Sequence, residues 1–374
     1  MKTAAAGFAM QARMRPWRGQ RRAGLAAALV TVTLALAAPS GAMASNPGDW
    51  TQENVNNAIA SGVDYLMTQQ DLTGTPGTNP NYGRVGSSYP VSETGMAIIS
   101  FGVLDQGHFA NLSAPRKASL QAAVNWLLKQ QDLTGDATSN SDYGSWNIGL
   151  QNYDTSLAIT GLSFSGDVPT DPSLQGVPAA MQKGRAWEIA HQTWPSSCDP
   201  PVPADPSQGP CGGFTYSGNP GSSADASNTG FAMTGIDLTG GVPAQVAQRN
   251  LVWQRHVQEL STNPGHHGTD NDGCGSYYPG FGSSGSFAYS NANDTGTLLF
   301  GFGYDGLKGN DLGVQAALAC GNNLLSAYVM SKDKRSMIAH HNDTLDARDR
   351  IRINANGDPH GRQATAKGLL QLLD

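Results

Sequence analysis

The feature that most constrains this chain is an internal repeat. The hexapeptide QQDLTG at residues 69–74 returns unchanged at residues 130–135, which lie 61 positions further on. The same offset aligns other residues without gaps, among them Thr94 with Thr155. Matches along one offset indicate a duplicated structural unit, and such a unit buries its apolar face only by stacking against its neighbours. The sequence therefore predicts a repeat architecture.

Each unit contains two helical segments joined by a polar loop. The first segment, such as residues 122–128, repeats apolar residues at spacings of three and four, which is typical of an amphipathic helix. A loop rich in Gly, Asn, Ser and Asp follows, and then a more apolar helix. Because Asp, Asn and Thr oxygens accept hydrogen bonds from the free N–H groups of a first helical turn, we expect caps at these helix starts. The predicted starts are Glu93-Thr94, Asp154-Thr155, Asn228-Thr229 and Asp294-Thr295.

A fifth and looser unit follows these four. Its first helix is expected at residues 314–330 and its second at residues 361–373. The alternation of a more polar and a more apolar helix is typical of two concentric layers, in which the apolar helices are packed on both sides. We therefore predict an all-α fold, an α/α toroid of about five helical hairpins, formed by residues 45–374 as one domain.

Residues 1–44 form a predicted signal peptide. Six basic and no acidic residues precede or flank an uncharged run at residues 23–38, and Ala42-Met43-Ala44 supplies the small-x-small pattern of a cleavage site. The alternative is a membrane anchor, but the run is rich in Ala and short for the roughly 20 residues that span a bilayer. We therefore predict a secreted or periplasmic protein without membrane insertion after cleavage.

The charge of the mature chain bears on its partners. The full sequence has a formal net charge of −6, and cleavage removes six basic residues, which leaves the remainder more acidic. An acidic surface repels phosphate backbones and anionic lipids, so neither nucleic acid nor a membrane surface is an expected partner.

Four cysteines follow the predicted leader. Export to an oxidising compartment favours disulfides. Cys198 and Cys211 bracket a Pro-rich loop and are predicted to bridge it, which leaves Cys274 and Cys320 as a second candidate pair.

The order of these motifs resembles the repeats of squalene cyclases and protein prenyltransferase β-subunits. The resemblance is carried by Gln-Gln-Asp, by Gly144-Ser145-Trp146 and by Asp-Thr before small and apolar residues, and it covers nearly all of residues 51–374. Members of this family form α/α toroids, so the resemblance implies that fold. It implies less about function, because the same fold hosts polysaccharide lyases, thioester domains and cofactor carriers.

The family's acid chemistry does not carry over to this chain. Squalene cyclases protonate an alkene with the motif Asp-x-Asp-Asp-Thr-Ala, and the matching stretch here, residues 291–296, is NANDTG. Asn293 replaces the carboxyl that the family uses as proton donor, and an amide cannot deliver a proton. Of the motif's acids only Asp294 remains. No Asp-Asp-x-x-Asp motif for diphosphate and magnesium occurs in the sequence.

Two weak metal motifs lie close together. Asp272-Gly273-Cys274 with His360 offers the residue types of the prenyltransferase zinc site, but Cys274 lies outside the family's register and is expected to be oxidised, whereas zinc needs the thiolate. Residues 270–273 alternate oxygen ligands before a Gly, as a calcium loop does. The bidentate Glu of such a loop is missing, so an Asx-turn is the simpler interpretation. We expect no metal and no cofactor.

Two groups of residues are candidates for a site at the mouth of the central cavity, because the loops that join the helices of each hairpin lie on one face. The first group combines carboxylates at inner-helix starts with loop aromatics, and its alternative role is capping and repeat core. The second is the charged fifth loop, whose alternative is a solvated surface. The candidate catalytic residues are Asp154, Asp294, His341 and Arg348, and the candidate ligand-binding residues are Tyr82, Trp146, Phe214, Tyr216 and Tyr289.

Three functions follow from these features. We expect first a secreted protein that binds a small molecule or polymer in the central cavity and lacks the family's general-acid motif. The alternative is a secreted polysaccharide lyase or hydrolase, in which His and Arg of the fifth loop would act on an anionic substrate. A terpenoid cyclase or prenyltransferase comes third, because the required acids are absent and prenyl diphosphates are cytosolic.

Overall fold

The computed structural model describes most of the chain after the predicted leader. The described residues are 52–104, 108–194, 198, 211–218, 224–260, 262, 273–278 and 292–330. Within them the chain is helical, and its only β-pairing consists of two isolated bridges. The all-α prediction is confirmed. The helices are α2 (Gln52–Thr68), α3 (Pro90–Leu104), η2 (Phe109–Asn111), α4 (Ala114–Gln130), α5 (Gln151–Ser163), α6 (Val177–Ala190), α7 (Ala226–Leu238), α8 (Ala244–Val257), α9 (Ala292–Tyr304) and α10 (Leu312–Met330).

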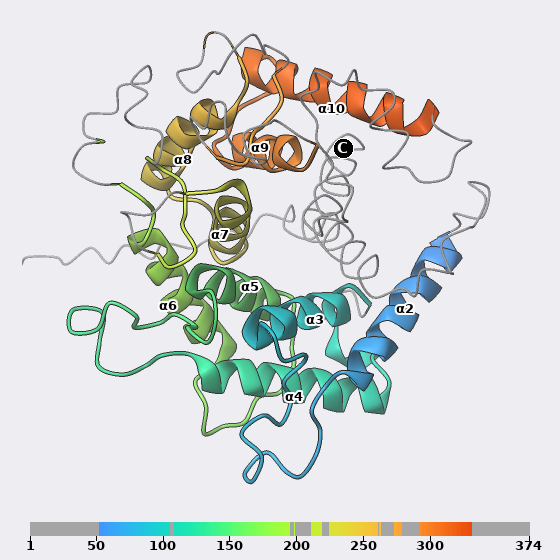
Figure 1. Ribbon diagram of the computed structural model, residues 1–374. Coiled ribbons are helices and arrows are strands. Elements are labelled where there is room, and N and C mark those ends of the chain that lie inside the picture. Colours follow the sequence, from blue (N-terminus) through green and yellow to red (C-terminus); the bar gives the residue numbers. More distant parts are fainter. Residues whose placement is uncertain are drawn as a thin grey trace, which may run out of the picture.

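The helices form two layers. α3 packs against α5, α5 against α7, and α7 against α9. Figure 1 shows these four helices side by side along the inner side of an arc, with α4, α6, α8 and α10 outside them. The inner helices are the second helices of successive hairpins, as the alternation of polarity predicts. The second helix of the fifth hairpin lies outside the described residues, so the closure of the arc into a ring stays a prediction.

The two layers differ in burial. In the inner helix α5, eleven of thirteen residues are buried, whereas the outer helix α4 buries eight of seventeen. Small residues let the inner helices approach closely: a Cβ on Gly95 of α3 would collide with the backbone of Leu157 in α5. The inner helix α5 is therefore packed on nearly all sides, whereas the outer helix α4 presents one face to water.

A glutamine just after each of the outer helices α2, α4, α6 and α8 joins successive units. Gln131, after α4, donates from Nε2 to the carbonyl oxygens of Gly144 in its own loop and Ala180 in α6, at 2.6 and 2.9 Å. Gly144 has a positive φ of 94°, and a Cβ there would meet the carbonyl oxygen of Lys183 in α6. The loop thus lies directly against the next outer helix. The same double donation is made by Gln70, Gln192 and Gln258.

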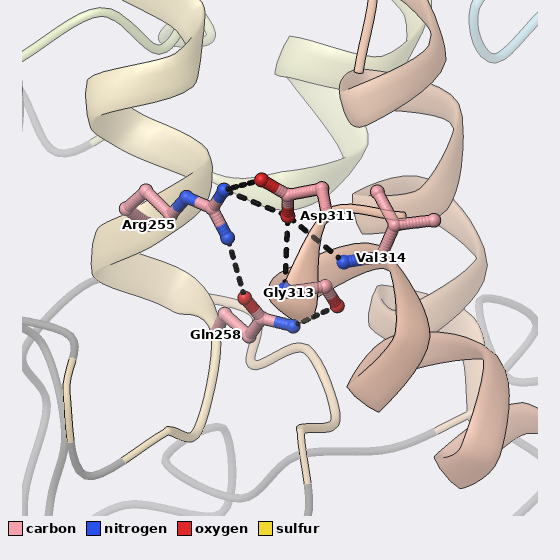
Figure 2. A network of polar contacts seen from close by, with 5 residues as sticks. All are labelled: Arg255, Gln258, Asp311, Gly313 and Val314. Atoms are coloured by element: carbon pink, nitrogen blue, oxygen red, sulfur yellow. Dashed lines mark hydrogen bonds and ion pairs between the residues drawn. The ribbon is translucent and has the colours of Figure 1, made fainter. Parts of the chain in front are cut away.

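The fourth of these contacts is reinforced by an ion pair. Figure 2 shows Arg255 of α8 facing Asp311, with Arg Nη2 2.9 Å from both carboxylate oxygens. Asp311 precedes α10 and accepts the backbone N–H groups of Gly313 and Val314, which form the first turn of that helix. Gln258 donates to the carbonyl oxygen of Gly313 at 2.7 Å. The outer helices α8 and α10 are therefore held together at the start of α10.

The helix-start motifs act differently from the predicted caps. Each motif Thr accepts a backbone N–H from the preceding loop, not from its own helix, at 2.9–3.0 Å; the pairs are Val85 to Thr94, Trp146 to Thr155, Phe214 to Thr229 and Gly275 to Thr295.

The prediction that the acidic or amide member of each motif caps its helix is wrong for α5 and α7. α5 begins at Gln151, three residues before Asp154, and its N-cap residue Leu150 makes no side-chain bond. In α7 the cap is Asp225, which accepts the N–H of Asn228 at 2.9 Å. The helices extend nearly one turn further toward the N-terminus than the apolar pattern indicates.

The predicted Cys198–Cys211 bridge is present, and the second candidate pair, Cys274 and Cys320, is also bonded. Cys198–Cys211 closes the Pro-rich loop, with its Cα atoms 6.1 Å apart. Cys274–Cys320 ties the loop after α8 to α10, with a Cα–Cα distance of 5.5 Å. Among the described helices, none combines the length and apolar character needed to cross a membrane.

Candidate functional site

The loops of successive units cross the starts of the inner helices. The N–H of Asn152, in the first turn of α5, donates to the carbonyl oxygen of Tyr216 at 3.0 Å. In the next unit, the N–H of Ala226 in α7 donates to Tyr277 at the same distance. Each loop therefore satisfies a free N–H group at the start of the preceding inner helix. This arrangement places a tyrosine beside each of these two helix starts.

Four tyrosines, Tyr153, Tyr216, Tyr277 and Tyr278, form what we call the tyrosine cluster. The rings of Tyr153 and Tyr216 stack with centroids 5.5 Å apart, and those of Tyr277 and Tyr278 meet edge to face at 4.7 Å. All four residues are half-buried. The hydroxyl groups of Tyr216 and Tyr277 lie 2.9 Å apart, and that of Tyr277 is also 2.9 Å from Ser227 Oγ. The cluster thus combines partly exposed aromatic rings with linked hydroxyl groups.

A buried carboxyl group anchors these hydroxyls. Asp225 has no exposed surface and accepts hydrogen bonds from Ser227 Oγ and Asn228 Nδ2, both at 2.6 Å, as well as from the Asn228 N–H. Burial raises the pKa of Asp225, and these hydrogen bonds oppose the rise. Because donors occupy both carboxyl oxygens, Asp225 orients Ser227 and the start of α7 and has little capacity left for a ligand.

The tyrosine hydroxyls of the cluster keep their protons. Burial, followed by the nearby Asp225 carboxyl, raises the pKa of Tyr216 and Tyr277, and it raises the pKa of Tyr278 to about 12. The same two causes raise the pKa of Tyr153. At neutral pH these groups therefore donate and accept hydrogen bonds, and none acts as a phenolate base.

One buried polar atom beside the cluster, Oδ1 of Asn228, has no hydrogen-bond partner within the described structure. The orientation of the Asn228 amide is determined by chemistry, since its nitrogen donates to the Asp225 carboxyl and its oxygen must face away. A buried polar atom without a partner costs about 1–3 kcal/mol, so this region retains capacity for a hydrogen-bond donor.

The two predicted catalytic carboxylates within the described residues, Asp154 and Asp294, are buried at the starts of inner helices. Asp154 is fully buried and accepts hydrogen bonds from Ser92 Oγ of α3 at 2.7 Å and from the N–H of Gly149 at 2.8 Å. Burial raises its pKa against the effect of these bonds. It therefore links two neighbouring inner helices. Asp294, in the first turn of α9, is also buried. His341 and Arg348 lie outside the described residues.

The aromatic residues predicted to bind a ligand divide between the hydrophobic core and the tyrosine cluster. Trp146 and Phe214 have no exposed surface, and the indole N–H of Trp146 donates to Leu127 at 2.7 Å. Contrary to expectation, both belong to the hydrophobic core, because the loop turns inward where its N–H meets the motif Thr. Tyr82 is half-buried in the first loop. Tyr216 joins the tyrosine cluster, and Tyr289 lies outside the described residues.

Sequence reasoning missed most of the cluster. Tyr277 follows Tyr216 by 61 positions, the offset of the first duplication, and this signal identifies it as the equivalent residue of the next unit. Tyr153 occupies the position two residues before the motif Thr, where two other units carry Ser92 and Ser227. A tyrosine at a helix start where other units have serine was therefore the sequence signal that could have identified Tyr153.

The metal motifs find no support in the described part of the chain. Cys274 is bonded to Cys320 and offers no thiolate for zinc. The described residues contain no group of three or more His, Cys, Asp or Glu side chains placed to hold a metal ion. Residues 270–272 and His360 lie outside the described part.

Comparison with known proteins leaves the function to be argued from the site. No model of a protein family matches the sequence, and no curated protein matches it either.

Proposed function

We propose that this is a secreted binding protein, built on the α/α repeat that resembles those of squalene cyclases, and that it holds its ligand at the tyrosine cluster. The observation that carries the proposal is the hydroxyl chain from Tyr216 through Tyr277 to Ser227, beside the stacked rings of Tyr153 and Tyr216. Partly exposed tyrosines supply large contact areas at low cost in conformational entropy, and they are enriched at binding sites.

The chemistry of the cluster favours binding over catalysis. The tyrosines keep their protons at neutral pH, and Asp225 is saturated by donors from its own helix start. Catalysis by proton abstraction needs a base whose pKa lies near the working pH. The tyrosines do not meet that condition, and the Asp225 carboxyl is engaged by Ser227 and Asn228, so both kinds of group suit a preorganised surface for hydrogen bonds.

Export is the second part of the proposal. It rests on the leader pattern of residues 1–44 and agrees with the two disulfides of the mature chain. Structural disulfides form and persist mainly in oxidising compartments outside the cytosol.

The binding proposal is tested by calorimetric titration of the mature protein, residues 45–374. The probes represent three ligand classes: a set of hexasaccharides, a neutral octapeptide and farnesol. We expect at least one probe to bind, and Tyr216→Ala with Tyr277→Ala to weaken that binding about tenfold or more. The matched control is Tyr65→Ala, which removes an exposed tyrosine of the outer helix α2.

Two outcomes would speak against this assignment. If the bound probe is held equally well by the double variant, the site lies elsewhere on the protein. The lyase alternative makes a different prediction: an acidic polysaccharide would be cleaved, and His341→Ala or Arg348→Ala would abolish turnover while binding persists.

A further inference from the structure

We propose that the ligand of the tyrosine cluster is an uncharged, hydroxyl-rich molecule, namely a neutral sugar chain. This inference rests on the proposed binding function and names the class of ligand for the same site. It follows from three independent properties of the cluster: the absence of cations from its own segments, its chain of protonated hydroxyls, and an unpaired acceptor beside half-buried rings.

The segments that build the cluster contain no cationic residue. Residues 146–163, 198–228 and 273–296 include no Lys, Arg or His. Three carboxyl groups, of Asp154, Asp225 and Asp294, are buried at the starts of the same inner helices. An anionic ligand such as a uronate or a sulfated sugar would find no counter-charge among these segments, and burial of an unpaired charge is strongly unfavourable.

A cationic ligand fits the cluster little better. Aromatic rings attract cations, but recognition of an ammonium group inside a site also calls for an available carboxylate. The oxygens of Asp225 are occupied by Ser227 and Asn228. Asp154 is likewise bonded to Ser92 and to Gly149. The buried acids therefore leave the site without a free negative partner.

The hydroxyls of the cluster match those of a sugar. A phenol that keeps its proton both donates and accepts a hydrogen bond, and so does each hydroxyl of a pyranose. Tyr216, Tyr277 and Ser227 form a continuous chain of such groups, with neighbouring oxygens 2.9 Å apart. Ser227 donates its proton to Asp225, so Tyr277 donates to Ser227 and Tyr216 donates to Tyr277. The Tyr216 oxygen then keeps a lone pair for a ligand hydroxyl, which suits a ligand that carries many hydroxyls and no charge.

The rings and the unpaired acceptor complete the fit. The half-buried faces of the tyrosine rings are apolar and can cover the C–H face of a sugar ring, while hydroxyls at the ring edge remain free to bond. Oδ1 of Asn228, a residue with no exposed surface, has no donor among the described residues. A ligand hydroxyl that enters the cluster supplies this donor.

The experiment compares hexasaccharides of different charge on the full mature protein. Cellohexaose, mannohexaose and N-acetylchitohexaose are the neutral probes, chitohexaose is the cationic probe, and hexagalacturonate is the anionic probe. We expect one or more neutral hexamers to bind at least tenfold more tightly than either charged hexamer. Raising the salt concentration from 50 to 500 mM should change that affinity less than twofold, because no ion pair contributes.

Variants separate the ligand class from the site. Tyr216→Ala should weaken binding of the neutral hexamer about tenfold or more, and Tyr216→Phe, which keeps the ring, should weaken it about three- to tenfold. Tyr65→Ala should change nothing. The circular dichroism and melting temperature of each variant establish that it is folded.

Each contrary outcome has a distinct meaning. Tighter binding of a charged hexamer that still depends on Tyr216 overturns the neutral class and leaves the binding site in place. Failure of every hexamer, with tyrosine-dependent binding of the octapeptide or farnesol, overturns the sugar class in the same way. Binding of any probe that is indifferent to Tyr216 and Tyr277 overturns both the class and the proposed function.

Discussion

The hydroxyl groups of Tyr216 and Tyr277 lie 2.9 Å apart, although 61 positions separate the two residues in the sequence. They occupy equivalent places, because each follows by two residues the loop N–H that binds Thr229 or Thr295. Stacking of the units brings equivalent loops next to each other. Duplication has thus supplied two copies of one side chain to a single site, and their direct contact couples the two units there.

The glycine that approaches the next outer helix is expected to tolerate no side chain. Gly144 has a φ of 94°, and a Cβ at this position would meet the carbonyl oxygen of Lys183. The substitution Gly144→Ala should therefore destabilise the protein by more than about 1 kcal/mol, through backbone strain together with the steric contact. Thermal and urea unfolding measure the change.

Gly303 provides the matched control for that substitution. It lies in α9, no atom stands within 4 Å of a Cβ placed on it, and the residue is exposed. Ala is preferred over Gly inside a helix by roughly 1 kcal/mol, so Gly303→Ala should leave stability unchanged or raise it. Equal effects of the two substitutions would contradict the close packing of the loop against α6.

A buried glutamate should make stability depend on pH. Glu188 of α6 has no exposed surface and accepts hydrogen bonds from Ser156 Oγ at 2.7 Å and Asn152 Nδ2 at 3.1 Å. Burial raises the pKa of Glu188 from 4.5 to about 8, while the bond from Ser156 opposes the rise. The folded protein thus holds this proton at pH values where the unfolded chain has released it. The stabilisation is complete below pH 4.5 and is lost as the pH rises through 8, at up to about 1.4 kcal/mol per pH unit between these values.

The variant Glu188→Gln removes this titration and keeps an amide of the same shape. Gln254 occupies the equivalent position of the next unit, because it lies four residues before Gln258 just as Glu188 lies four residues before Gln192. The fold therefore accommodates an amide at this position. Urea unfolding at pH 5, 6.5 and 8 should show a smaller loss of stability with pH in the variant. Burial also raises the pKa of Asp305 to about 8, so addition of Asp305→Asn should reduce the dependence further. Glu53→Gln, at an exposed position, is the control. If the unfolding free energy of the double variant falls with pH as steeply as that of the unmodified protein, this account is refuted.

The two disulfides should contribute unequally to stability. Cys198–Cys211 closes a loop of 13 residues, and Cys274–Cys320 closes one of 46. Restriction of the unfolded chain by loops of these lengths corresponds to about 3 and about 4 kcal/mol, respectively. We expect Cys274→Ser with Cys320→Ser to lower the melting temperature more than Cys198→Ser with Cys211→Ser. The opposite order of melting temperatures, in the variants and in the reduced and alkylated controls, would contradict this expectation. It would show that native contacts contribute more to stability than restriction of the unfolded chain does.

The sequence by itself predicted the local organisation of the chain. The 61-residue offset and the apolar periodicity indicated paired helices, and α10 at Leu312–Met330 agrees closely with the expected helix at 314–330. The Cys198–Cys211 bridge also followed from the sequence, because the two cysteines bracket a Pro-rich loop, whereas the structure established the pairing of Cys274 with Cys320. These features depend on hydrophobic spacing and turn residues, which are local properties that a single sequence displays.

Tertiary structure decided the role of each polar residue. Asp154 and Thr155 carry the residue types of a helix cap, yet they bind a neighbouring helix and a loop, because the helix begins a turn earlier than its apolar pattern. Trp146 entered the core, whereas Tyr153, which no sequence motif singled out, stacks on Tyr216 of another unit. Such contacts depend on which units stand side by side and on which way each loop turns. The periodicity of one sequence gives neither the neighbouring units nor the direction of each loop. The tyrosine cluster could therefore be identified only from the contacts between units in the folded structure.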